Sequence, residues 1–206
     1  MTEKQIQNYI WEKRENFASL LEVPKFQEVK IENPTYASPS DVLYNMVIEG
    51  YKKLWETMSD IGFFGCEVSL TENGQSTMRT DFLAYRYGSD GIIVIELKKS
   101  DQTARQAYTE LLAYGSYLRT KFTPMSGGDI IYVLISPVGE RIVEQATINT
   151  LIYDNNKVCL LVPKYEDDDV NTLKLELWIP DKKVFKDLSY SSILRLFFSG
   201  SEEPSV

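Results

Sequence analysis

The apolar run at residues 130–136, IIYVLIS, constrains the fold more than any other part of the sequence. A strand that is apolar on both faces has to be covered on both faces, which is typical of the centre of a parallel or mixed sheet. A second run, residues 92–98, is apolar for four positions and then changes abruptly to charged side chains. These two segments predict a sheet whose centre is buried between layers of helices.

Two helix signals precede the sheet. Thr2 and Gln5 have the spacing of a capping box, which predicts a first helix that ends before Pro24. Ser38, followed directly by a proline, has the pattern of a second helix start. Apolar residues then recur at spacings of three and four, so we expect an amphipathic helix that ends at Gly62.

The rest of the chain has the pattern of a strand meander followed by helical crossovers. We expect meander strands at residues 63–71, 78–87 and 92–98, with turns at 72–75 and 88–91. A long helix begins at Ser100 or Asp101. After it we expect the buried strand at 130–136, a helix at 139–155, strands at 157–163 and 172–179, and a closing helix at 189–198.

This order predicts an α/β fold with a mixed central β-sheet flanked by helices. We expect a single domain over residues 1–206, with a core at about 38–136 and C-terminal helix and strand additions at 137–206. A domain near this size buries roughly 70% of the surface of its unfolded chain, so the fold needs no disulfide or structural metal.

The chain contains no histidine, which excludes several classes of enzyme. Ser-His and Cys-His catalysis, histidine-ligated zinc, and imidazole as a general base all require that side chain. The two cysteines, Cys66 and Cys159, are far apart and lack the spacing of a cysteine-rich zinc site. They are typical of core residues, and we expect the protein to be cytoplasmic.

The charge and hydropathy of the chain limit its partners. No window approaches 18 consecutive apolar residues, and the N-terminal residues lack the apolar region of a signal peptide, so we expect no membrane association. The net charge of −8 argues against a protein that coats nucleic acid through bulk charge. A local basic groove is compatible with it, and Lys99 and Arg105 are candidates to contact nucleic acid.

The charged end of the strand at 92–98 is the candidate site. Alternation places Glu96 and Lys98 on the same face as two aliphatic residues, where a carboxylate and an ammonium are costly to desolvate unless they are paired or metal-bound. Asp81 lies in the preceding strand among residues that favour burial. Strands joined by a tight turn are neighbours, so the register can place Asp81 beside Glu96. The result is an acidic pocket with a cation at its rim.

Such a pocket is suited to a hard divalent cation, Mg²⁺ or Mn²⁺, held by the oxygens of Asp81 and Glu96. A metal of this kind acidifies bound water and neutralises charge that develops on a phosphodiester. Lys98 could orient or deprotonate the attacking water, or stabilise the transition state by its charge. None of these roles needs histidine.

Asp81, then Glu96-Leu97-Lys98 across a hairpin, then a helix with Gln102 and Gln106, resembles the restriction-endonuclease-like (PD-(D/E)xK) nuclease superfamily. The segments RTDFLAY, GIIVIELKKS and ARQAYTELLAY are similar to the N-terminal nuclease domains of type I restriction subunits. The resemblance covers about half of the chain. It implies a core of helix, three-strand meander, helix and strand, and a role in restriction, repair or phage defence.

The resemblance also assigns roles to residues. It implies that Asp81 and Glu96 bind the metal, that Lys98 is catalytic, and that Gln106 helps to position the site or the DNA. A glutamate of the first helix, Glu3 or Glu12, could join the metal shell. The sequence departs from the family pattern at two positions: Thr80 stands where the family has proline, and Glu110 stands where the RecB-like subgroup has tyrosine.

Three interpretations follow. The first is a metal-dependent nuclease acting on nucleic acid, DNA before RNA. Because the chain has little room for a sequence-reading domain, its specificity would come from partners in a larger protein complex, from DNA structure or from a homodimer. The second is an inactive nuclease-like fold that serves as an interaction module. The third is an unrelated α/β protein in which the charged residues form an ion pair. Glu67 is open to a structural role or to metal contact.

Overall fold

The computed structural model describes residues 1–33, 37–70, 78–87, 91–122, 130–137, 141–154 and 157–188, and for residues 101–105, 141–142, 152–153 and 186–188 it describes the backbone alone. The expected turns at 72–75 and 88–91 fall wholly or largely outside these residues, and the closing helix at 189–198 lies entirely outside them. The chain divides into two compact units. The first comprises Met1–Lys25 and Tyr51–Trp178, and the second comprises Phe26–Gly50 and Ile179–Val206. The single-domain assignment stays a prediction.

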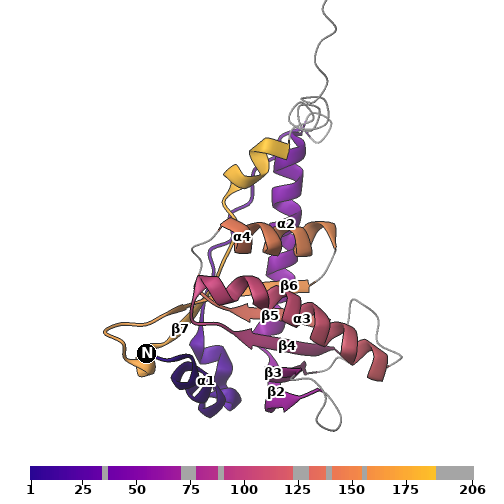
Figure 1. Ribbon diagram of the computed structural model, residues 1–206. Coiled ribbons are helices and arrows are strands. Elements are labelled where there is room, and N and C mark those ends of the chain that lie inside the picture. Colours follow the sequence, from indigo (N-terminus) through magenta and orange to yellow (C-terminus); the bar gives the residue numbers. More distant parts are fainter. Residues whose placement is uncertain are drawn as a thin grey trace, which may run out of the picture. The chain divides into compact units, whose positions relative to one another are not determined.

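The first unit is built on a seven-stranded mixed sheet (Figure 1). Its strands are β1 (Leu21–Glu22), β2 (Ile61–Ser69), β3 (Arg79–Arg86), β4 (Ile92–Leu97), β5 (Ile130–Ile135), β6 (Lys157–Lys164) and β7 (Lys174–Leu177), in the spatial order β1-β7-β6-β5-β4-β3-β2. The pairs β4–β5 and β5–β6 are parallel, whereas β2–β3, β3–β4 and β6–β7 are antiparallel. This confirms the predicted α/β class with a mixed sheet flanked by helices, and the predicted meander.

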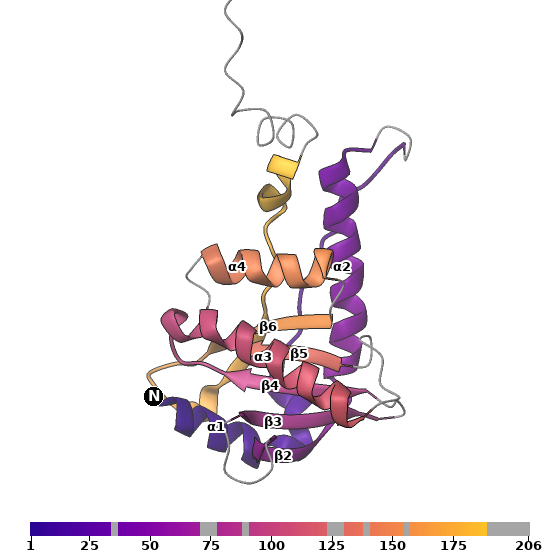
Figure 2. The same ribbon diagram turned by 45° about the vertical axis from the view of Figure 1, so that its right-hand side comes forward.

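Helices of the first unit cover the sheet. Helix α3 (Asp101–Lys121) contacts β4 and β5, and α4 (Arg141–Ile148) packs beside α3 (Figure 2). Leu83 and Val94 belong to the buried core beneath α3. Phe82, the neighbour of Leu83 in β3, points to the other face, where its ring stacks with Trp11 of α1 (Glu3–Glu12) at a centroid distance of 6.4 Å.

The capping box predicted for α1 is present. The Gln5 N–H donates to Thr2 Oγ1, and the Thr2 N–H donates to Gln5 Oε1 at 2.7 Å. The helix itself ends earlier than expected, at Glu12. Residues Arg14–Leu20 continue as 3-10 turns, with a non-helical backbone at Asn16 (φ −134°, ψ 40°). The cap therefore fixes where this helix begins. The non-helical backbone at Asn16 prevents the segment that ends before Pro24 from forming one continuous helix.

The expected boundary between the second helix and the first strand was wrong by a few residues. Helix α2 (Pro39–Met58) ends before Ser59, and β2 already includes Ile61 and Gly62. Ile61 pairs with Arg86, and Gly62 with Tyr85. Ile61 has helical spacing from Met58, but pairing with β3 satisfies its backbone in the sheet, and this tertiary contact outweighs the local pattern.

Within the second unit, side chains link segments that are distant in sequence. The Asn45 amide exchanges two hydrogen bonds with the backbone of Val29, at 2.8 and 2.9 Å. The Tyr44 and Phe185 rings pack edge to face at 5.8 Å, and Lys182 pairs with Asp41 at 2.8 Å. The candidate site described below lies entirely in the first unit.

Gly115 in α3 should be intolerant of alanine. A Cβ built at this position would lie 2.2 Å from the Tyr132 hydroxyl and 2.6 Å from its ring. Tyr132 is buried in β5, and its hydroxyl accepts a hydrogen bond from Arg119, so the ring has little freedom to move. We expect Gly115→Ala to lower the free energy of unfolding by about 1–3 kcal/mol, the usual cost of overpacking.

The matched control for this prediction is Gly50→Ala. A Cβ at Gly50, in α2, meets nothing within 4 Å. Because alanine favours a helix over glycine by roughly 0.5–1 kcal/mol, we expect this variant to be as stable as the parent or more stable. Urea denaturation of the three proteins measures both effects. Equal stability of Gly115→Ala and the parent would contradict the overpacking argument.

Candidate functional site

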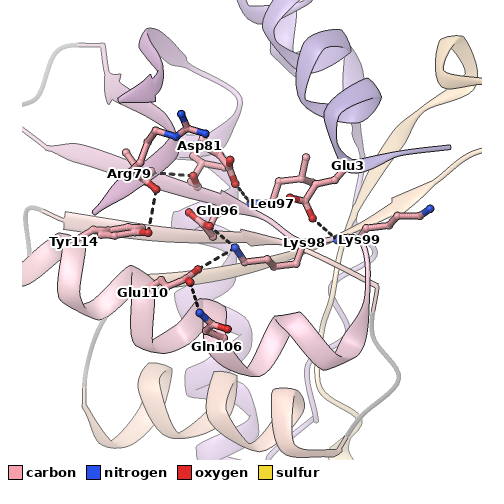
Figure 3. A network of polar contacts seen from close by, with 12 residues as sticks. Glu3, Arg79, Asp81, Glu96, Leu97, Lys98, Lys99, Gln106, Glu110 and Tyr114 are labelled. Carbon is pink, nitrogen blue, oxygen red and sulfur yellow. Dashed lines mark hydrogen bonds and ion pairs between the residues drawn. The ribbon is translucent and has the colours of Figure 1, made fainter. Parts of the chain in front are cut away.

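The site forms where β3 and β4 separate. Their backbone register runs from Tyr85↔Ile92 to Phe82↔Ile95, and continuing it by one residue places Asp81 opposite Glu96. At this point a side chain makes the next link between the strands: the Leu97 N–H donates to Asp81 Oδ2 at 2.8 Å. The carboxylates of Asp81 and Glu96 lie side by side at this strand end (Figure 3).

Asp81 is held from two sides. In addition to the Leu97 N–H at Oδ2, its Oδ1 accepts a hydrogen bond from Gln7 Nε2 of α1 at 3.0 Å. Lys4 Nζ donates to Gln7 Oε1 at 3.0 Å. Since an ammonium can only donate, Lys4 fixes the orientation of the Gln7 amide, so that its NH₂ group faces Asp81. The carboxylate of Asp81 is thus oriented before any ligand binds.

Glu96, which is buried, forms an ion pair with Lys98, which is half-buried. Lys98 Nζ lies 2.6 Å from Glu96 Oε1 and 2.9 Å from Glu110 Oε2, so α3 contributes a second carboxylate to the same ammonium (Figure 3). The Glu96 residue is 3% exposed. Among the residues that the structure describes, its second oxygen, Oε2, has no hydrogen-bond partner. An unpartnered buried carboxylate oxygen is costly, and a bound cation would satisfy it.

The electrostatics of the site follow from three carboxylates around one ammonium. Burial, followed by the negative charge of Asp81, raises the pKa of Glu96 to about 8. Burial is also the main cause of the raised pKa of Asp81. The hydrogen bond from the Leu97 N–H has the opposite effect and lowers this pKa. For Lys98, burial lowers the pKa, but the hydrogen bonds and charges of Glu96 and Glu110 together outweigh burial and raise it. The site carries more negative charge than Lys98 can compensate.

Helix α3 presents a polar face to this strand end. Gln106 is exposed and donates from Nε2 to Glu110 Oε1 at 2.8 Å, so it reaches Lys98 only through Glu110. One turn further, the Tyr114 hydroxyl donates to the Arg79 carbonyl at 3.0 Å. Burial, with the charges of Glu96 and Glu110, raises the pKa of Tyr114 to about 12. These residues are spaced by four, which aligns them on one side of the helix.

Other residues expected at the site have different positions. Glu3 Oε2 accepts a hydrogen bond from the backbone N–H of Lys99 at 3.0 Å, which ties α1 to the end of β4. The Lys99 side chain is exposed and points away from the carboxylates (Figure 3). Glu12 is exposed at the end of α1. The Arg105 side chain lies outside the described residues, so its expected contact with nucleic acid stays a prediction.

Glu67 has ion-pair partners. Its Oε1 lies 2.8 Å from Lys4 Nζ and 3.4 Å from the Arg79 guanidinium. The hydrogen bond from Lys4 is the main cause of its lowered pKa. The backbone of Glu67 is left-handed, with φ 51°, which is uncommon for a residue other than glycine. Because Cys66 pairs with Phe82 and Val68 with Thr80, this strained residue stands opposite Asp81.

Three residues of the site were not among the sequence-based candidates: Gln7, Glu110 and Tyr114. In the sequence, Glu110 stood out only as a departure from a family pattern. Its spacing of four from Gln106 and from Tyr114 could have indicated that the three residues lie on one side of the helix. Gln7 is one turn from Glu3 and is buried, but the sequence of α1 does not show which strand end this helix covers.

The donor set fits a hard divalent cation. Mg²⁺ prefers one or two carboxylates and keeps several waters, and Asp81 and Glu96 supply two carboxylates, one with the unpartnered oxygen. Within the described part of the chain, no group of three or more acidic or cysteine side chains is arranged to hold a metal ion. A cation at this site would therefore depend on water and substrate oxygens for most of its coordination.

Neither protein-family models nor curated protein sequences match the chain. One solved structure, the crystal structure of a repair endonuclease from Pyrococcus abyssi, is similar with a TM-score of 0.34 and 16% sequence identity. The similarity covers 64% of this chain and 48% of that chain. In the residues described, no helix is long and apolar enough to cross a membrane.

Proposed function

We propose that the chain is a metal-dependent nuclease that hydrolyses phosphodiester bonds of nucleic acid, with DNA as the first substrate to test. The observation that carries the proposal is the buried Glu96 carboxylate, which lies beside Asp81, pairs with Lys98 through one oxygen and leaves the other oxygen without a partner. The arrangement of Asp81, Glu96 and Lys98 on adjacent strands, with a helix following, is also what the resemblance to PD-(D/E)xK nucleases implies.

Asp81 and Glu96 are the residues that would hold the cation, as Mg²⁺ or Mn²⁺. When bound, such a cation acidifies water and neutralises charge that develops on the phosphorus oxygens. The protein's own contribution is to orient the ligands: Gln7 and the Leu97 N–H fix the two oxygens of Asp81, and Lys98 fixes one oxygen of Glu96. Orientation before binding reduces the cost of assembling the reactive geometry.

Lys98 is placed to act by its charge. An ammonium has three N–H donors, and one of them donates to Glu96 Oε1, while Glu110 Oε2 lies 2.9 Å from Nζ as an ion-pair partner. A donor that does not bind Glu96 can meet a phosphate oxygen or the attacking water. Because two carboxylates stabilise the charged form, this geometry supports electrostatic stabilisation of the transition state over proton abstraction by Lys98. Glu110 and Gln106 act through Lys98 and are positioning residues.

A cleavage panel tests this function. Supercoiled plasmid, linear duplex, single-stranded DNA and RNA are incubated with the protein in Mg²⁺ or Mn²⁺, and in EDTA. We expect cleavage of at least one substrate with metal and none in EDTA, while calorimetry detects Mn²⁺ binding that Asp81→Ala removes. Metal binding without cleavage of any substrate would favour the interaction module. Absence of both metal binding and cleavage would favour an unrelated α/β protein in which the charged residues form an ion pair.

A further inference from the structure

Lys4 and Arg79 form a small basic cluster at the edge of the acidic site. They come from α1 and β3, and both contact the same atom, Glu67 Oε1, at 2.8 and 3.4 Å. The side chains of Lys4 and Arg79 are 56% and 60% exposed, so each can meet a ligand from solvent. Two cations share one carboxylate, which leaves a surplus positive charge beside the carboxylates of Asp81, Glu96 and Glu110.

This cluster is connected to Asp81 through one side chain. The ammonium of Lys4 that contacts Glu67 also donates to Gln7 Oε1, and Gln7 Nε2 donates to Asp81 Oδ1. Only the side-chain amide of Gln7 would therefore separate a group bound by Lys4 from Asp81, the carboxylate that we assign to the metal.

We infer that Lys4 and Arg79 are a binding subsite for a backbone phosphate flanking the scissile bond, and that Glu67 occupies this subsite as a resident anion when nucleic acid is absent. The inference rests on the proposed function. A phosphate presents several acceptor oxygens, which suits an ammonium and a guanidinium arriving from different elements.

The energetics allow the phosphate to replace Glu67. Exposed ion pairs contribute only about 0–1 kcal/mol, so separating Arg79 or Lys4 from Glu67 costs little. Glu67 also has a left-handed backbone, which is disfavoured for a residue with a side chain. The Lys98–Glu96 pair is different, because Glu96 is buried and removing Lys98 would leave its charge without a partner.

The test uses Lys98→Ala as the parent protein, so that nucleic acid in Mg²⁺ is bound without turnover. Into this parent we introduce Arg79→Gln, Lys4→Gln or Glu67→Gln, with Lys157→Gln, an exposed lysine at the start of β6, as the matched control. Fluorescence anisotropy of a labelled duplex and a labelled single strand gives the affinity at several NaCl concentrations. Circular dichroism and Mn²⁺ calorimetry verify folding and the metal site.

We expect Arg79→Gln and Lys4→Gln each to weaken binding roughly 3–10-fold at low salt and to reduce the salt slope by about one. Glu67→Gln should act in the opposite direction and tighten binding, because the competing anion is gone. Arg79→Gln and Glu67→Gln should leave Mn²⁺ affinity unchanged. A purely structural role for the cluster predicts no tightening in Glu67→Gln.

Three results would overturn the inference. If the Arg79 and Lys4 variants keep the affinity and salt slope of Lys157→Gln, or if Glu67→Gln does not tighten binding, the cluster is not a phosphate subsite although the proposed function stands. If the parent binds Mn²⁺ but no nucleic acid at low salt, the proposed function fails and the subsite fails with it.

Discussion

Lys98→Ala is expected to abolish most of the proposed nuclease activity while the protein still binds metal and nucleic acid. The ammonium is needed mainly where negative charge develops in the transition state, so its loss should lower kcat by about 10²–10⁴-fold and change KM little. Plasmid nicking in Mg²⁺, with Mn²⁺ calorimetry on the same samples, measures both properties. Asp81→Ala and Glu96→Ala should instead lose metal affinity and activity together, because each carboxylate neutralises part of the cation.

Lys98→Arg separates the two roles open to this residue. Arginine keeps the charge but stays protonated, so partial recovery of rate would support electrostatic stabilisation, and no recovery in a folded protein would point to Lys98 as a base. Because removing Lys98 leaves Glu96 and Glu110 uncompensated, rates have to be compared at temperatures where all variants are folded. Full activity of Lys98→Ala would refute the mechanism.

Glu96→Gln is expected to make the metal-free protein more stable at alkaline pH. The pKa of Glu96 is about 8 in the folded state, against 4.5 for the ordinary group, because of burial and the charge of Asp81. Between these values the folded protein holds a proton that the unfolded chain has released, so the free energy of unfolding of the parent falls as pH rises. A glutamine side chain does not titrate, so this contribution to the fall in the free energy of unfolding is missing from the variant.

The difference between Glu96→Gln and the parent should therefore grow from pH 4.5 to about pH 8, by on the order of 2–4 kcal/mol, and then level off. Urea denaturation in EDTA across this range measures it. Glu12→Gln makes the same chemical change at an exposed position and should keep the slope of the parent. If stabilities of Glu96→Gln and the parent ran parallel across this range, Glu96 would not be the group that holds the proton.

Local patterns were sufficient to predict the elements that carry the site. The capping box at Thr2 marks the first residue of α1, and the change from apolar to charged residues at Glu96 marks the end of a buried strand. The short connection between two strands was enough to predict that they are neighbours, but whether Asp81 lies beside Glu96 depended on the register, and the observed pairing ends one residue away, at Phe82↔Ile95.

The partners of these residues could not be predicted because tertiary packing decides them. Gln7 and Asp81 are brought together by the docking of α1 against β3, to which the stacking of Trp11 on Phe82 contributes. No spacing in the sequence encodes that distance. The position of Glu110 is similar: its helix could be predicted, but the rotation of the helix about its axis, which directs Glu110 at Lys98, depends on how α3 packs on the sheet.

The carboxylates of Asp81 and Glu96 are held in position by residues of different helices. Asp81 is oriented by Gln7 of α1, and Glu96 is held through Lys98 by Glu110 of α3. A cation shared by Asp81 and Glu96 would therefore act as a cross-link between two helices that are far apart in the chain. Ligand binding at this strand end would stiffen both at once, and a partner that shifted either helix could adjust the affinity of the site without touching it.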